Sequence, residues 1–189
     1  MEQADPRHLL VKIAKTLEKL KISYLVTGGM AVLVWGRPRF TADIDIIIKL
    51  KSENVDKLEK ALKTIGEAGY IDKAAIEEAI VRRGEFSFID GETGVKVDFW
   101  VIKDDSFDLR QLKRRTRKEI LDKRVYFITP EDLILNKLIW YKDCQSERHL
   151  EDVESVLKIS KSKIDLNYLK KWAKHKGVLG ILNKILKKK

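Results

Sequence analysis

The hydrophobic positions in the first quarter of the chain follow a helical period and then become continuous. Leucine and isoleucine recur at three- and four-residue steps over residues 9–20, which predicts an amphipathic helix ending near residue 21. Residues 22–27 are then mostly apolar, as expected of a short buried strand. Residues 30–35 are apolar and predict a short helix, and residues 43–49 alternate in the manner of a strand. The chain therefore begins with mixed helices and strands.

The middle of the chain continues this mixture. Apolar spacing predicts helices over residues 52–65 and 73–82, with Ser52 as the N-cap of the first. Residues 85–102 read as a β-hairpin whose turn, residues 91–94, contains two glycines. A further short strand is predicted at residues 125–128.

The last third of the chain has a helical period throughout. Thr129 and Pro130 suit an N-cap and the first position of a helix, and a second helix start is expected at Asp165, after a break following Ser160. Strands and helices followed by helices alone indicate an α+β fold with a helical C-terminal region. We predict a core over residues 1–128 and a helical region over residues 129–189 that packs on it.

Two carboxylates stand out in the strand over residues 43–49. Because side chains alternate in a strand, Asp43 and Asp45 project to one face and Ile44 and Ile46 to the other. Neighbouring carboxylates raise each other's pKa unless a cation lies between them, and hard oxygen ligands suit Mg²⁺ or Mn²⁺. The alternative is that they are solvated acids at the end of an edge strand.

A glycine pair precedes these carboxylates. Gly28 and Gly29 lie between a predicted strand and a predicted helix, where a backbone without Cβ atoms can approach a phosphate and free N–H groups face an anion. A tight turn between strand and helix would also favour glycine.

These motifs together resemble a known family. Gly28-Gly29, followed after thirteen residues by Asp43-Ile44-Asp45 with Arg39 and Thr41 before it, resembles the nucleotidyltransferase superfamily of the DNA polymerase β type, especially its AbiEii-type toxin and related stand-alone branches. The resemblance implies a mixed β-sheet flanked by helices, with a third acidic residue on a neighbouring strand. In residues 95–101 the only carboxylate is Asp98.

The resemblance extends more weakly to the helical region. Residues 129–138, Arg148 and residues 151–153 resemble the part of the family in which a lysine and a later aspartate line the active cleft, which implies this role for Lys137 and Asp152. From the residues alone, Lys137 either points outward or reaches a charged partner, and Asp152 could pair with Arg148.

The activity implied by the resemblance is transfer of an NMP from an NTP to an acceptor hydroxyl. Asp43, Asp45 and Asp98 would be the catalytic residues and would bind Mg²⁺ or Mn²⁺. The residues implied to contact the nucleotide phosphates are Gly28, Gly29, Arg39, Lys137 and Asp152. Arg39 could instead be a structural partner of the carboxylates. The rival interpretations are a nucleic-acid or protein binding module that keeps the fold without turnover, and a kinase-like phosphotransferase.

Charge adds candidate partners. The net charge is +10, and residues 157–189, with eleven lysines and one acid, carry all of it. A second basic cluster follows the strand of Asp98 and comprises Arg110, Lys113, Arg114, Arg115, Arg117 and Lys118. Both segments could attract RNA or tRNA, and solvated surface is the alternative for the tail. The AbiEii-type branch also implies a separate antitoxin protein.

The cellular setting follows from what the sequence contains. A single cysteine, Cys144, cannot form an internal disulfide and lacks the companions of a structural zinc site. The first residues show no apolar signal, and no apolar run reaches the roughly 20 residues that span a bilayer. We therefore expect a soluble cytoplasmic protein with no membrane partner.

Overall fold

A computed structural model describes residues 5–65, 68–103 and 105–187. The chain divides into two compact units. The first comprises residues 1–30 and 40–128, and the second comprises residues 31–39 and 129–189. The helix α2 (Gly28–Trp35) begins in the first unit and continues into the second.

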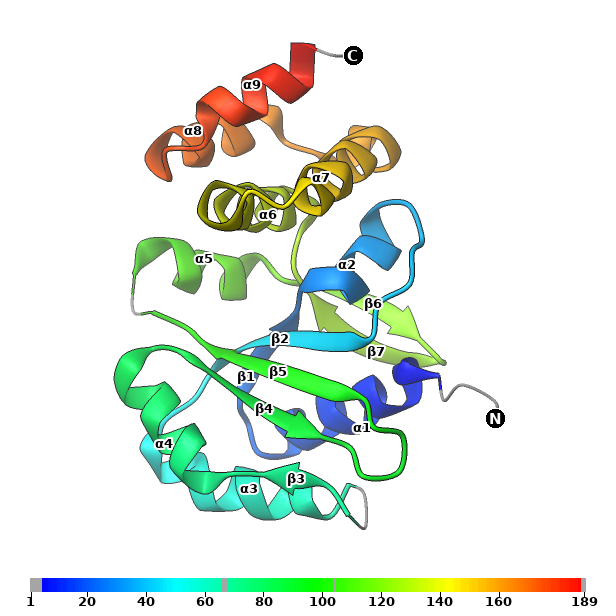
Figure 1. The fold of residues 1–189 in the computed structure, drawn as a ribbon, viewed down its shortest axis with the longest axis vertical. Coiled ribbons are helices and arrows are strands. Elements are labelled where there is room, and N and C mark those ends of the chain that lie inside the picture. The colour runs from blue at the N-terminus through cyan, green and yellow to red at the C-terminus, as the bar shows by residue number, and fades with distance from the viewer. Residues whose placement is uncertain (1–4, 66–67, 104, 188–189) are drawn as a thin grey trace. The chain divides into compact units, whose positions relative to one another are not determined.

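The first unit, within the described residues, is built on a seven-stranded mixed sheet (Figure 1). Its strand order is β3-β4-β5-β2-β1-β7-β6. The strands are β1 (Ser23–Val26), β2 (Asp43–Lys49), β3 (Tyr70–Ile71), β4 (Glu85–Ile89), β5 (Lys96–Val101), β6 (Thr116–Ile120) and β7 (Lys123–Phe127). The pairs β2 with β5 and β1 with β7 are parallel, and the other neighbours are antiparallel. Helices joined to such a sheet confirm the predicted α+β class.

Four α-helices accompany the sheet in the described part of this unit. They are α1 (Pro6–Lys19), α3 (Val55–Lys63), α4 (Lys73–Arg82) and α5 (Ser106–Arg114), with a 3-10 turn at η1 (Ser52–Asn54). The helix α1 packs on β1, β2 and β7, and α3 contacts both α1 and α4. Asp5 caps α1 by accepting a hydrogen bond from the backbone of Arg7, and Leu10, Ile13 and Leu17 are fully buried.

The two faces of the central strands differ sharply in polarity. On β2, Ile44, Ile46 and Ile48 are fully buried, and on the parallel neighbour β5 Val97 and Phe99 are also fully buried. Burying such side chains contributes about 1.5–3 kcal/mol each, so this face fixes the register of β2 and β5. The carboxylates of these strands consequently lie on the opposite face.

The second unit contains helices only, within the residues described. They are the C-terminal part of α2, then α6 (Pro130–Cys144), α7 (Glu147–Ile159), α8 (Leu166–His175) and α9 (Leu179–Lys187), with a 3-10 turn at η2 (Lys161–Lys163). The helix α6 packs on α7 and α8, and α8 packs on α9. Thr129 caps α6 through Oγ1, which accepts a hydrogen bond from the backbone N–H of Asp132 at 3.4 Å. The helix starts predicted at Thr129 and Asp165 are confirmed.

Three features differ from the sequence prediction. The helix α2 starts at Gly28, so the glycine pair belongs to its first turn. Ser52 begins the 3-10 turn η1 and does not cap α3, whose N-cap is Asn54. The helix α5 and the strand β6 were not predicted, because the basic residues of this segment leave little apolar periodicity.

Two expectations from the sequence are not tested by the helices and strands described above. The division into domains 1–128 and 129–189 stays a prediction, which limited proteolysis would test. The last residues of the basic tail, Lys188 and Lys189, lie outside the described residues.

Among the helices that are described, none combines the length and the apolar character needed to cross a membrane.

Candidate active site

Three carboxylates share one face of the sheet. Along β2, burial alternates so that Asp43 is exposed and Asp45 is half-buried on the face opposite the isoleucines. In the parallel pair of β2 and β5, Asp45 is the register partner of Asp98. Paired residues of neighbouring strands point to the same side of a sheet, so Asp98 joins the face of Asp43 and Asp45. The structure thus places Asp43 and Asp45 on one face, as their alternation predicts, and places Asp98 beside them on the neighbouring strand.

Asp98 is the most buried of the three, and each of its oxygens accepts a hydrogen bond. Its residue is 8% exposed. Ser87 on β4 donates from Oγ to Asp98 Oδ1 at 2.6 Å, and Lys96 donates from Nζ to Oδ2 at 2.9 Å. The hydrogen bond to Asp98 raises the pKa of Lys96, and the charge of Asp43, its register partner, adds to this shift. Lys96 is thus a cation set among the carboxylates.

The oxygen-rich face is chemically suited to a hard divalent cation. Carboxylates are the ligands that Mg²⁺ and Mn²⁺ prefer, and two or three of them on a rigid sheet match the usual binding of these ions beside phosphates. In the described part of the chain, no three histidine, cysteine, aspartate or glutamate side chains are gathered into a ready-made metal cluster. The carboxylate oxygens of this face are suitable metal ligands, and Lys96 forms a hydrogen bond with one oxygen of Asp98.

The glycine pair lies directly against the carboxylate strand. A Cβ atom at Gly28 would lie 1.8 Å from Asp45 Oδ2, and one at Gly29 would lie 2.1 Å from Thr41 Oγ1. Gly28 also has a φ of +59°, a conformation that side chains rarely adopt. The backbone N–H of Thr27, the residue before the pair, donates to the carbonyl of Asp45 at 2.9 Å. Glycine is therefore required at these positions by the packing of Asp45 and Thr41.

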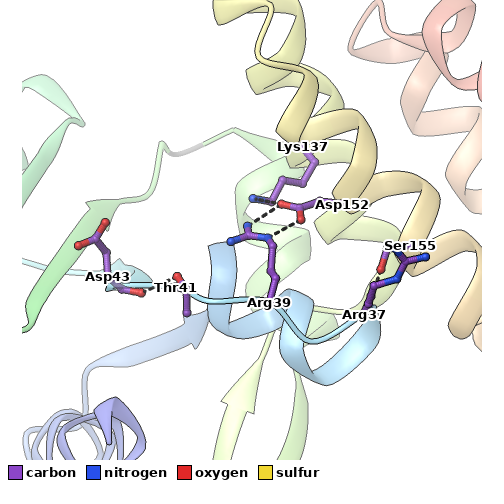
Figure 2. Close-up of polar contacts among 7 residues, drawn as sticks. All are labelled: Arg37, Arg39, Thr41, Asp43, Lys137, Asp152 and Ser155. Carbon is purple, nitrogen blue, oxygen red and sulfur yellow. Dashed lines mark hydrogen bonds and ion pairs between the residues drawn. The ribbon is translucent and has the colours of Figure 1, made fainter. Parts of the chain in front are cut away.

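Thr41 shapes the start of the carboxylate strand. Its Oγ1 donates to the backbone carbonyl of Asp43 at 3.3 Å (Figure 2). This side-chain to backbone contact is the loop-shaping role expected of a threonine before the strand.

A second group of charged side chains lies in the helical unit. Arg39 binds Asp152 with two parallel hydrogen bonds, from Nε to Oδ1 at 2.7 Å and from Nη2 to Oδ2 at 2.8 Å (Figure 2). Lys137 Nζ lies 2.9 Å from Asp152 Oδ2. The side chains of Lys137 and Asp152 are only 5% and 3% exposed, so this cluster is buried as well as paired.

Two cations share the carboxylate of Asp152 in this cluster. Burial alone would raise the pKa of Asp152, but the hydrogen bonds from Arg39 and the charge of Lys137 outweigh burial and lower the pKa. Asp152 therefore stays ionised and holds both cations in fixed positions. Of the alternatives for Lys137, the structure shows the charged partner, and Arg39 is a structural partner of Asp152.

A cavity of about 710 Å³ in the helical unit adjoins this cluster. Arg39 and Asp152 form part of its wall, and it is otherwise lined by Arg37, Glu151, Glu154, Ser155, Lys158 and Ile185. The backbone N–H of Arg37 donates to Ser155 Oγ, which attaches the segment after α2 to α7 (Figure 2). The cavity is large enough for a nucleotide-sized ligand.

Comparison with known proteins decides the family. The model of the family described as "Nucleotidyl transferase AbiEii toxin, Type IV TA system" matches residues 12–186. The chain belongs to the AbiEii nucleotidyltransferase family. It is therefore a nucleotidyltransferase, and the resemblance read from its motifs is confirmed. No curated protein sequence matches the chain.

Solved structures support the fold assigned to this AbiEii-family chain. A nucleotidyltransferase-like antigenic protein from Paracoccidioides brasiliensis has 20% identity and a TM-score of 0.53, covering 80% of this chain and 75% of its own. The lincosamide antibiotic adenylyltransferase LnuA has 16% identity and a TM-score of 0.54, covering 82% and 98%. The antibiotic-resistance factor ANT(2")-Ia, in complex with adenylyl-2"-tobramycin, has 15% identity and a TM-score of 0.56, covering 87% and 92%. At these identities the similarity establishes the nucleotidyltransferase fold.

Several residues that contact the candidate site residues of this AbiEii-family chain were not predicted from the sequence. Ser87 reaches Asp98 through the register of β4 and β5, and Lys96 reaches it from the same strand. Ser155 binds a segment far away in the chain. For Lys96, the signal was available, since it stands two residues before Asp98 and alternation places both on one face. Ser87 and Ser155 carried no such signal.

Proposed function

We propose that this AbiEii-family nucleotidyltransferase transfers an NMP from an NTP to an acceptor hydroxyl in a Mg²⁺-dependent reaction, with Mn²⁺ as a substitute. The observation that carries the proposal is the common face of Asp43, Asp45 and Asp98, with the glycine pair packed against Asp45. Carboxylates in this arrangement suit phosphoryl chemistry, in which catalysis is mainly positioning and charge neutralisation.

The carboxylates of β2 and β5 have separate tasks in this proposal. Asp43, Asp45 and Asp98 would hold the metal, which supplies neutralisation of the triphosphate and a lowered pKa for the attacking hydroxyl. Ser87 keeps Asp98 oriented through the 2.6 Å hydrogen bond to Oδ1. Gly28 and Gly29 contact the phosphates through the backbone at the start of α2, where N–H groups without helical partners attract anions.

Arg39 and Lys137 are proposed to contact the phosphates as well. Asp152 holds both cations in place, and Arg39 also lines the cavity that is large enough for a nucleotide-sized ligand. Cationic side chains with several N–H donors are well suited to phosphate oxygens. In this role, Asp152 positions the two cations.

The acceptor is proposed to be RNA, with tRNA as one form of it. The support is the basic cluster on α5 and β6 and the lysine-rich tail, either of which can attract a polyanion. The family description includes a toxin of a Type IV system, from which we propose an antitoxin partner and a cytoplasmic setting.

The experiment is transfer of label from each α-³²P-labelled NTP, with Mg²⁺, to total cellular RNA, protein or small molecules. The wild type is compared with Asp43→Asn/Asp45→Asn. Label in the RNA fraction that the variant fails to produce is the expected result. Label in another fraction would retain the reaction and reject RNA as the acceptor.

Thermal melting separates this enzyme from a binding module without turnover. A nucleotide held at 100 times its Kd stabilises the fold by about 2.7 kcal/mol. Absence of label in every fraction, together with no melting shift for any NTP with Mg²⁺, would favour the binding module.

A further inference from the structure

A basic pocket lies in the first unit at the end of the sheet where β1 begins. Its volume is about 300 Å³. The residues of its wall that matter here come from the end of α1, the turn after it, the start of β1, the residue between α5 and β6, and the strands β6 and β7. They are Glu18, Lys21, Tyr24, Arg115, Arg117 and Tyr126. Three cations and one carboxylate among these residues make the wall positively charged. None of these residues belongs to the carboxylate face.

Two guanidinium groups converge on one tyrosine in this pocket. The guanidinium carbon of Arg115 lies 4.4 Å from the ring centroid of Tyr126, and that of Arg117 lies 4.8 Å from it. Arg117 is the register partner of Tyr126 across β6 and β7, so the sheet itself holds this pair. Arg115 is held from the other side because Nη1 donates to the carbonyl of Leu112 at the end of α5.

This arrangement favours an anion as the ligand. Two like charges near one ring repel each other, and the ring quadrupole offsets the repulsion only partly. A phosphate that accepts hydrogen bonds from both guanidinium groups would remove the repulsion and use the fork geometry of arginine. The ring of Tyr126 is engaged by cations, so the pocket offers donors more than a surface for stacking bases.

Tyr24 contributes a fixed and uncharged part of the wall. The ring of Tyr24 meets that of Tyr126 edge to face, with centroids 5.7 Å apart. The hydroxyl of Tyr24 donates to Glu18 Oε1 at 3.1 Å and accepts from the backbone N–H of Tyr126 at 3.4 Å. Burial raises the pKa of Tyr24, so this hydroxyl stays protonated and Tyr24 adds no negative charge to the wall.

We propose that Arg115 and Arg117 form a binding site for the phosphodiester backbone of single-stranded nucleic acid. Ser23, where β1 starts, is five residues before Gly28, so at about 3.3 Å per residue the pocket is roughly 17 Å from the glycine turn along the chain direction. The site binds a strand away from the carboxylates and without regard to base sequence. The inference rests on the proposal that RNA is the acceptor, and binding is measured without NTP, so failure of this site and failure of nucleotidyl transfer can be distinguished.

The test is fluorescence anisotropy with a short fluorescein-labelled oligouridylate, without Mg²⁺ or NTP, over a salt series. Arg115→Met/Arg117→Met removes both guanidinium groups. Lys123→Met/Arg124→Met is the matched control, because it removes the same charge from exposed positions on the same hairpin outside the pocket wall. We expect the pocket variant to weaken binding roughly tenfold at low salt and to reduce the salt slope by about 1.4, from about 0.7 for each of two phosphate contacts.

A further variant separates loss of binding from loss of folding. Arg115→Lys/Arg117→Lys keeps the charge, and we expect it to melt like the wild type and to bind with intermediate affinity. Equal losses in the pocket variant and the matched control would overturn the proposal, since general electrostatics would then account for binding. Binding of anionic lipid vesicles is measured for the same variants. The proposal would also be overturned if the pocket variant bound the oligouridylate normally, whether or not it lost the binding of vesicles.

Discussion

Gly28 lies so close to Asp45 that a Cβ atom at position 28 would stand 1.8 Å from the Oδ2 atom. The start of α2 and the carboxylate strand β2 are thus fitted to each other before any ligand is considered. A larger residue at position 28 has to displace the side chain that we propose as a metal ligand. Gly28 and Asp45 therefore form one structural element of the site.

Gly28→Ala tests this relationship against a matched glycine. Gly94 has a φ of +69°, and a Cβ atom there would meet nothing within 4 Å, so Gly94→Ala meets backbone strain alone. We expect Gly94→Ala to lower the free energy of unfolding by about 1 kcal/mol. Gly28→Ala should cost a further 1–3 kcal/mol, roughly the penalty of overpacking. Urea denaturation measures both, and equal losses would contradict the close approach of Gly28 and Asp45.

Much of the carboxylate face could be predicted from the sequence because it depends on local alternation. Asp43 and Asp45 are two residues apart in one strand, so their common face follows from a period of two. The strand of Asp98 could be predicted from its own alternation and from the glycines of the hairpin turn. The parallel pairing of β2 with β5 could not be read locally, since these strands are separated by two helices. The resemblance to a family implied only that the third carboxylate lies on a neighbouring strand.

The charged cluster of the helical unit shows what local patterns cannot provide. Arg39 and Asp152 are 113 residues apart, and only tertiary packing brings them together. From the sequence, Arg148 was an equally good partner for Asp152 because it lies one helical turn away. The two-point contact with Arg39 and the buried ion pair with Lys137 became visible only in the fold.

Asp152→Asn should be more damaging to stability than Lys137→Met. The first change removes the charge of the carboxylate that binds both Arg39 and Lys137, and breaking a buried pair in this way costs about 3–5 kcal/mol. The second change leaves the two-point contact of Arg39 with Asp152 in place. Glu151→Gln, on an exposed neighbouring position of α7, is the control and should be nearly neutral. Chemical denaturation would contradict this order if Lys137→Met were the more destabilised variant.

The stability contributed by Asp152 should depend on pH on the acid side. Its pKa in the folded protein is below the ordinary value of 3.8, because the hydrogen bonds from Arg39 and the charge of Lys137 outweigh burial. A lowered folded pKa gives stability that is present above the unfolded pKa and is lost as the pH falls through the folded pKa. The difference in unfolding free energy between wild type and Asp152→Asn should therefore be constant at neutral pH and shrink below about pH 4. A difference that grows on acidification would refute this account of Asp152.

Lys96→Met should increase the affinity for divalent metal. Lys96 Nζ lies 2.9 Å from Asp98 Oδ2, so the variant removes a cation from the proposed metal site. We expect Mn²⁺ to bind roughly five- to twentyfold more tightly, as the repulsion between nearby charges implies. Lys49→Met, at the far end of β2, is the control for general charge. Measurement of free Mn²⁺ by electron paramagnetic resonance gives the affinity, and equal gains in both variants would argue against a specific role for Lys96.

The measurement that tests the central claim most directly compares α-³²P and γ-³²P labelled NTP, with Mg²⁺, in wild type and in Asp45→Asn. This substitution keeps the shape of the side chain beside Gly28 and removes its charge. If nucleotidyl transfer takes place at this face, the wild type moves the α label to the acceptor and leaves the γ label in pyrophosphate. The variant is expected to transfer no label. Transfer of the γ label, or unchanged transfer of the α label by the variant, would contradict the account.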